Sequence, residues 1–148
     1  MTIVAALDRL QSGFLVFHQW VYEASGGRVG HRLIGVPTLL LHTTGAKTGQ
    51  PRTAALVYAM DGADYVVVAS NGGADTPPGW LANVRAAPEV SVQVATRRLS
   101  VTASVLVPGD EDYASLWRLV NDNNHGRYDA YQAKTQRPIA LVRLSPAG

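Results

Sequence analysis

Residues 90–107 read VSVQVATRRLSVTASVLV. Apolar side chains alternate with polar or small ones before and after the Thr-Arg-Arg interruption, which is typical of two half-buried β-strands, 90–95 and 99–107. Consecutive strands joined by short turns predict a mostly antiparallel sheet, and closure into a barrel would remove its exposed edges. The other predicted strands lie at 37–43, at 53–60 and 65–70 joined across Asp61-Gly62, and at 139–144.

Helices are predicted between these strands and ahead of them. Thr76-Pro77 resembles an N-cap followed by proline at the first helical position, so a helix should cover residues 78–86 until Pro88 ends it. Two more helices are expected at 110–121 and 126–135. A leading helix over residues 2–22 carries an apolar stripe; it either packs on the core or on a partner subunit, or makes a peripheral membrane contact.

Composition predicts one globular domain. The chain has 148 residues, is 47% hydrophobic and 16% charged, and carries a formal net charge of +2. We expect a single domain over 1–148, in which residues 1–30 form the leading helix and a glycine-rich connection. The absence of cysteine excludes disulfide scaffolds and thiolate chemistry. No signal peptide or membrane-spanning run is evident, so we expect a cytoplasmic protein, peripheral to the inner face of the plasma membrane at most.

The segment Thr43-Thr44-Gly45-Ala46-Lys47-Thr48-Gly49-Gln50-Pro51-Arg52 has the ingredients of a phosphate-binding nest. Its glycines let backbone N–H groups turn toward a ligand, and Lys47 and Arg52 add two cations where no acid is near. It is not a Walker A loop, because the order of glycine, lysine and threonine differs and no helix follows. From residue types alone, a polar hairpin with solvated basic side chains explains it equally well.

Two further clusters could line a pocket. In the first, Ser70-Asn71-Gly72-Gly73 precedes a helix bearing Trp80 and Asn83, which suits an anion or a carbonyl-rich ring; a plain loop with a core tryptophan is the alternative. The second, near the C-terminus, consists of Tyr128, Tyr131, Lys134 and Arg137. A helix would place the two tyrosines on one face, as substrate contacts or as ordinary packing. The four histidines show no metal-ligand spacing, so no metal is expected.

Five blocks together resemble the deazaflavin-dependent nitroreductase family of actinobacteria. They lie within residues 32–146, in the order and at the spacing of that family: Gly35-Val36-Pro37 through Arg52, Val68-Ala69-Ser70-Asn71-Gly72-Gly73, Pro78-Gly79-Trp80-Leu81-Ala82-Asn83, Ala87-Pro88-Glu89-Val90 and Tyr128-Asp129-Ala130-Tyr131-Gln132. The resemblance implies a mainly β (α+β) split barrel, similar to flavin reductases and FMN-binding proteins. It also implies coenzyme F420, an 8-hydroxy-5-deazaflavin with a phosphate and an oligoglutamate tail.

The resemblance also assigns roles to residues. Lys47 and Arg52 would meet the phosphate, while Tyr128 and Tyr131 would face the substrate. Ala46 stands where many relatives have a basic residue, which removes one cation. The implied cofactor-binding residues are Thr44, Gly45, Lys47, Thr48, Arg52, Ala69, Ser70, Asn71, Gly72, Gly73, Pro78, Trp80 and Asn83.

The implied activity is hydride transfer from the reduced deazaflavin to a small electron-poor acceptor such as a quinone, enone or nitroaromatic. As a hypothesis, Tyr128, Tyr131, Ser70 or water supplies the proton. Two alternatives are an FMN-dependent oxidoreductase on the same barrel and a non-catalytic F420 carrier. Nucleic-acid binding is not expected, because a stacking surface of aromatic and basic residues is missing. A homodimer fits the apolar stripe of the leading helix.

Overall fold

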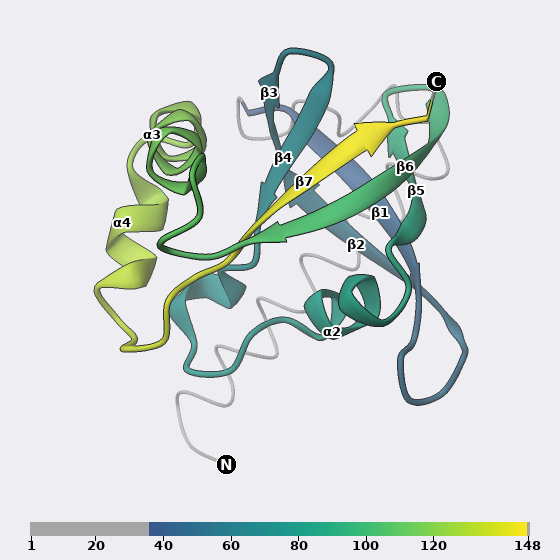
Figure 1. The fold of residues 1–148 in the computed structure, drawn as a ribbon, viewed down its shortest axis with the longest axis horizontal. Helices are drawn as coiled ribbons and strands as arrows, with labels where there is room; N and C mark the ends of the chain where they lie inside the picture. Colours follow the sequence, from purple (N-terminus) through teal and green to yellow (C-terminus); the bar gives the residue numbers. More distant parts are fainter. Residues whose placement is uncertain (1–35, 148) are drawn as a thin grey trace.

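The computed structural model describes residues 36–147, which form a curled antiparallel sheet with helices packed against it (Figure 1). Within that range the sheet has seven strands in the order β2-β1-β5-β6-β7-β4-β3. The predicted fold class, a mainly β barrel-like fold with inserted helices, is confirmed. The strands are β1 (Thr38–Thr44), β2 (Pro51–Val57), β3 (Ala59–Asp61), β4 (Asp64–Val68), β5 (Glu89–Val94), β6 (Arg97–Leu106) and β7 (Leu141–Pro146).

The single strand predicted at 53–60 is wrong, because the chain divides there into β2 and β3 at Tyr58. β2 pairs with β1 and β3 pairs with β4, so the two pieces lie at opposite ends of the strand order although they are consecutive in sequence. Tyr58 is buried and its N–H donates to Pro37 O at 3.1 Å. The sheet therefore curls until its two edges meet at this residue, and β2 contacts β4.

The inner face of the curled sheet holds the main core. Leu39, Leu41, Val92 and Val142 are fully buried there, in alternation with outward-facing residues of the same strands. Helix α2 (Gly79–Ala86) lies against β1 and β6 and places Trp80, Leu81 and Val84 in this core (Figure 1). The predicted N-cap at Thr76 is wrong: the cap position is Pro78, and no side chain caps the helix.

A second core lies on the outer face of β3, β4 and β7, beneath two helices. These are α3 (Tyr113–Asn123) and α4 (Arg127–Gln132), drawn at the left of Figure 1. Leu116 and Val120 of α3 pack on Val66 and Ile139, together with Tyr128 of α4. The two helices join β6 to β7, so they stand beside the end of β4, from which the turn of residues 70–73 begins.

The leading helix predicted over residues 2–22 and the glycine-rich connection after it lie outside the described residues. So do the side chains of His18, Arg28, His31 and Arg32. In the part of the chain that is described, no helix is long and apolar enough to cross a bilayer.

Candidate functional site

The loop between β1 and β2 is a tight bend closed by hydrogen bonds between its own backbone groups. The Gly45 N–H donates to Gln50 O at 2.8 Å, and the Gly49 N–H donates to Gly45 O at 2.8 Å. A Cβ at position 45 would stand 2.7 Å from the Thr48 hydroxyl oxygen and 3.3 Å from Gln50 O. Glycine at 45 therefore lets the Thr48 hydroxyl fold over the loop, where it accepts from the Gln50 N–H at 3.2 Å.

Two cations flank this bend. Arg52 approaches the Thr48 hydroxyl with Nη2 at 3.5 Å and its own neighbour Pro51 O with Nη1 at 3.3 Å. Lys47 is exposed, and between residues 36 and 147 every ion pair belongs to Arg143 rather than to either loop cation. No hydrogen bond within that range uses the backbone N–H of Lys47 or Thr48. The loop thus offers two charges and two N–H groups to an anion.

Asn83 of α2 fastens the loop to the body of the protein. Its Oδ1 accepts from the Ala46 N–H at 2.9 Å, and its Nδ2 donates to the Thr43 hydroxyl at 3.0 Å. Asn83 is 8% exposed and Thr43 is 7% exposed, so both polar side chains are buried and satisfy each other. The amide that was predicted to line a ligand is used inside the protein.

The turn after β4 is a 3-10 helix, η2 (Asn71–Gly73), with an uncommon backbone. Asn71, Gly72 and Gly73 have φ values of 45°, 65° and 86°, all in the left-handed region. A Cβ at position 73 would stand 2.6 Å from the carbonyl oxygen of Tyr131, so only glycine allows this approach of the turn to α4. The predicted turn and the predicted substrate-side tyrosine are therefore neighbours.

The two tyrosines of α4 occupy different environments. Tyr128 is 5% exposed, with its ring centroid 6.4 Å from that of Trp117 and 6.1 Å from that of Tyr131. Burial raises the pKa of Tyr128 to about 12, although a hydrogen bond with Asn124 opposes the shift. Tyr131 is half-buried, and Lys134 Nζ lies 5.7 Å from the centroid of its ring. Tyr131 is the more accessible phenol of the pair.

Two residues predicted to contact the ligand belong largely to the core. Trp80 is 9% exposed and Ala69 is fully buried, both among the inner-face residues of the barrel. The Ala69 N–H donates to Ala140 O at 2.9 Å, so it is already used. Pro78 and Ser70 are half-buried at the rim, and Thr44 is exposed. Among these predicted ligand contacts, Trp80 and Ala69 are thus buried, whereas Pro78, Ser70 and Thr44 reach the surface.

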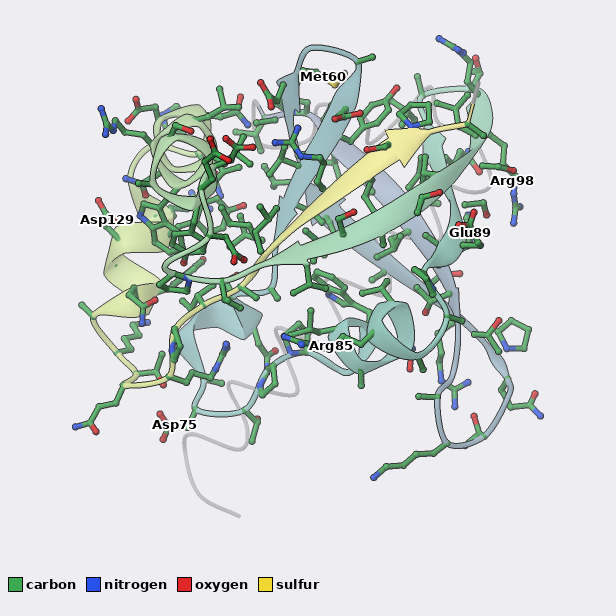
Figure 2. All side chains as sticks on the ribbon, in the orientation of Figure 1. Met60, Asp75, Arg85, Glu89, Arg98 and Asp129 are labelled. Atoms are coloured by element: carbon green, nitrogen blue, oxygen red, sulfur yellow. The ribbon has the colours of Figure 1, made fainter. Side chains whose placement is uncertain are left out.

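Sequence reasoning missed the role of Asp129. Its carboxylate accepts from the indole N–H of Trp117 and from Asn121 Nδ2, each at 2.8 Å, and its own N–H donates to Asn121 Oδ1 at 3.0 Å. These bonds clip α4 onto α3, and Figure 2 shows Asp129 on the outer side of the two helices. No spacing signal in the sequence reveals such a contact between neighbouring helices.

Histidines and acids form no metal site in the described residues. His42 lies on β1 with Nδ1 3.0 Å from the Thr53 hydroxyl of β2. The candidate functional groups of the described residues thus lie at two places. One is the cationic loop of residues 45–52, and the other is the turn of residues 70–73 with Tyr131. Helix α2 connects them, since the turn leads into it and its Asn83 holds the loop.

Known proteins resemble this chain in sequence and in fold. An F420H(2)-dependent quinone reductase of Mycobacterium tuberculosis is 52% identical over 132 residues, covering 88% of this chain and 89% of that protein. The solved structure of an F420-H2 dependent reductase (FDR-A) superposes with a TM-score of 0.66 at 36% identity, covering 74% of this chain and 94% of that one.

A second solved structure, described as a domain-swapped dimer, has a TM-score of 0.68 at 32% identity and covers 95% of this chain and 98% of that one. A FAD-binding protein of Mesorhizobium loti, at 21% identity and a TM-score of 0.54, shares the fold alone. The model of one family, described as F420H(2)-dependent quinone reductase, matches residues 15–146. The chain belongs to the F420H(2)-dependent quinone reductase family.

Proposed function

We propose that this protein oxidises F420H2 and reduces a quinone-type acceptor. The observation that carries the proposal is the cationic loop of residues 45–52, which stands without a carboxylate partner among the described residues in a chain 52% identical to an F420H(2)-dependent quinone reductase. The charge of F420 resides in its phosphate and glutamate tail. A cationic loop for that end and a turn that can receive a ring, connected by α2, would match the two ends of the cofactor.

The loop fits a phosphate group. Lys47 and Arg52 supply positive charge, and the Thr48 hydroxyl can donate because its contacts with Gln50 and Arg52 use only its oxygen as acceptor. The unused N–H groups of Lys47 and Thr48 add two donors of fixed direction. We assign Asn83 to the support of this loop, through Ala46 and Thr43, rather than to direct contact with the deazaflavin ring.

The turn of residues 70–73 would receive the ring system. Ser70 lies in the right-handed helical region and Asn71 in the left-handed one, an order that can turn successive backbone N–H groups toward one ligand. Pro78, which is half-buried, and Trp80, which is 9% exposed, would complete this wall. The backbone of Tyr131 lies against Gly73, and its half-buried side chain is the proposed contact for a second molecule placed against the ring.

When bound, the reduced deazaflavin supplies a hydride, the two-electron step that this class of cofactor favours. Reduction of a quinone to a hydroquinone needs one hydride and one proton, and the protein must deliver or admit that proton. Tyr131 and Ser70 are half-buried beside the turn and are the proposed donors, with water as the third. Tyr128 keeps its proton because burial raises its pKa to about 12, so we propose that it supports Tyr131 instead.

Assembly and location follow as finer proposals. We propose that the chain is one domain over 1–148 and forms a homodimer, supported by the relative described as a domain-swapped dimer. We also propose a cytoplasmic location with peripheral contact to the inner face of the plasma membrane, which would bring the enzyme to a quinone dissolved in lipid.

One experiment tests the function. The purified protein is titrated with F420 and, in parallel, with FMN, and is then supplied with F420H2 and a soluble quinone such as menadione. We expect F420 to bind in preference to FMN, and the oxidised deazaflavin to appear only when both protein and quinone are present. Tight binding of FMN with no binding of F420 would contradict the proposal. Binding of F420 without turnover would favour a non-catalytic F420 carrier.

A further inference from the structure

The Arg137 side chain is bound to three carbonyl groups of the turn that leaves β4. Its Nε donates to Ala74 O at 2.8 Å, its Nη2 to Ser70 O at 2.9 Å and its Nη1 to Ala69 O at 3.3 Å. Arg137 is half-buried and follows α4 in sequence, 63 to 68 positions away from its acceptors. Few side chains can collect three carbonyls, because only the guanidinium presents a planar set of five N–H donors.

The turn needs such a restraint. Asn71 adopts a φ of 45° without being glycine, and two more left-handed residues follow it. Residues held in this region cost free energy and persist only where their surroundings fix them. On one side the turn is fixed by the close approach of Gly73 to Tyr131, and on the other by the three bonds to Arg137.

Arg137 is itself held by α4. Gln132 Nε2 donates to Arg137 O at 2.8 Å, and Gln132 Oε1 accepts from the Ile139 N–H at 3.0 Å. Thr135 adds a bond from its hydroxyl to Asp75 at 2.8 Å, just beyond the turn, in the connection that Figure 2 marks by Asp75. The segment after α4 therefore acts as a brace for the turn rather than as a loose connection.

The bonds to Arg137 also determine which groups the turn leaves for a ligand. Its carbonyls at positions 69, 70 and 74 are drawn toward the guanidinium, and the N–H groups of Gly73 and Ala74 are used within the turn. No hydrogen bond within residues 36–147 uses the backbone N–H of Asn71 or Gly72. The turn thus has two backbone N–H donors available to a ligand, which suits a ring that carries carbonyl oxygens.

We propose that Arg137 is a positioning residue for the deazaflavin ring: by holding the carbonyls of the turn, it orients the N–H groups of Asn71 and Gly72 toward the ring carbonyls. The proposal rests on the proposed function, since it takes the turn as the ring-binding wall. It differs from a role in phosphate binding, because Arg137 interacts with the turn and the phosphate loop is held separately by Asn83.

The test uses two ligands that distinguish the ring end of the cofactor from its phosphate end. One is F420; the other is its 8-hydroxy-5-deazaflavin precursor form, called the analogue here, which has the ring but lacks the phosphate and the glutamate tail. Both are titrated by fluorescence into the wild-type protein and the Arg137→Gln, Arg137→Lys and Lys47→Ala variants. We expect Arg137→Gln to weaken both ligands by the same factor, about tenfold, as expected when a ring contact is lost. Lys47→Ala should weaken F420 and leave the analogue unchanged.

Arg137→Lys keeps the charge but can reach fewer of the three carbonyls, so its affinity for both ligands should fall between wild type and Arg137→Gln. Hydrogen exchange of the unliganded protein should be faster at residues 70–74 in both arginine variants. If Arg137→Gln does not fold, Arg137→Lys alone decides, by the same comparison.

The outcomes separate the two claims. Wild-type affinity for the analogue in a folded Arg137 variant would overturn the positioning role while leaving the proposed function intact. A larger loss for F420 than for the analogue would overturn it as well, by moving Arg137 to the phosphate end. If the wild-type protein binds neither ligand, the proposed function itself fails, whatever the variants do.

Discussion

Asn83→Ala tests how the phosphate loop is supported. The substitution removes an acceptor 2.9 Å from the Ala46 N–H and a donor 3.0 Å from the Thr43 hydroxyl. Each bond contributes about 0.5–1.5 kcal/mol, so the free energy of unfolding should fall by about 1–3 kcal/mol. For a domain of this size each kcal/mol lowers the Tm by roughly 2–4 °C. The expected fall in Tm is therefore about 2–12 °C.

The same change should weaken cofactor binding at one end only. Without Asn83 the backbone at Ala46 is no longer fixed, and the loop must be ordered again when the phosphate binds. If about 1.4 kcal/mol of binding free energy is used in that ordering, the Kd for F420 rises about tenfold. The analogue without phosphate does not need the loop, and its Kd should stay at the wild-type value.

Asn123→Ala is the matched control. Asn123 also makes a part-buried amide bond, from Nδ2 to Tyr58 O at 2.9 Å, but it lies on α3, away from the loop. Its loss should lower stability by about 0.5–1.5 kcal/mol and leave both affinities unchanged. Urea unfolding and fluorescence titration of the three proteins measure these effects. If Asn83→Ala loses stability yet keeps its F420 affinity, or weakens the analogue equally, the assigned support role is refuted.

Three further predictions concern the two ends of the site. Gly45→Ala should lower the free energy of unfolding by about 1–3 kcal/mol, since the added Cβ would stand 2.7 Å from the Thr48 hydroxyl and 3.3 Å from the backbone oxygen of Gln50. It should also weaken F420 binding by turning that hydroxyl away, and an unchanged Kd would contradict this. Lys47→Ala should weaken F420 by about 1.5–3 kcal/mol, and the loss should shrink in high salt, because an exposed charge is screened; a loss independent of salt would argue against a phosphate contact. Tyr128 has its pKa raised to about 12, so its stabilising effect is complete below pH 10 and is lost as the pH rises toward 12, by on the order of 2–3 kcal/mol; Tyr128→Phe should flatten the fall in urea stability between pH 9.5 and 11.5, and an equally steep fall in the variant would count against the burial of this phenol.

Local sequence patterns predicted the strands well where pairing partners are close in sequence. The alternation at 90–107 gave β5 and β6, because each strand buries one face and the Thr96 turn returns the chain directly. The hairpin at Asp61-Gly62 is also confirmed, with Asp61 opposite Asp64. In these cases the periodicity of a few residues contains the information that the fold uses.

The division at Tyr58 could not be predicted in this way. Residues 53–60 read as one strand because nothing in them interrupts β propensity, yet β2 and β3 pair with different partners across the seam of the curled sheet. That choice depends on the curvature of the whole sheet, which a local pattern does not contain. The N-cap predicted for α2 was wrong for a local reason. Thr76 has the right chemistry for a cap, but the helix begins after Pro78, which occupies the cap position.

The candidate site residues also divide into those found from the local sequence and those whose partners are distant in sequence. Lys47, Thr48 and Arg52 were found from composition and glycine placement, and the structure gathers them in one loop. The support roles of Asn83 and Arg137 depend on contacts across 37 to 68 positions of sequence, so residue types alone placed them only in the neighbourhood of a ligand. Their bonding partners required the fold.

A crystal structure of the complex with F420 tests most directly whether the cationic loop binds the phosphate. We expect the phosphate between Lys47 and Arg52, with its oxygens at about 2.7–3.2 Å from the Thr48 hydroxyl and the backbone N–H groups of residues 47 and 48. A phosphate bound elsewhere, with Lys47 and Arg52 both turned to solvent, would contradict it.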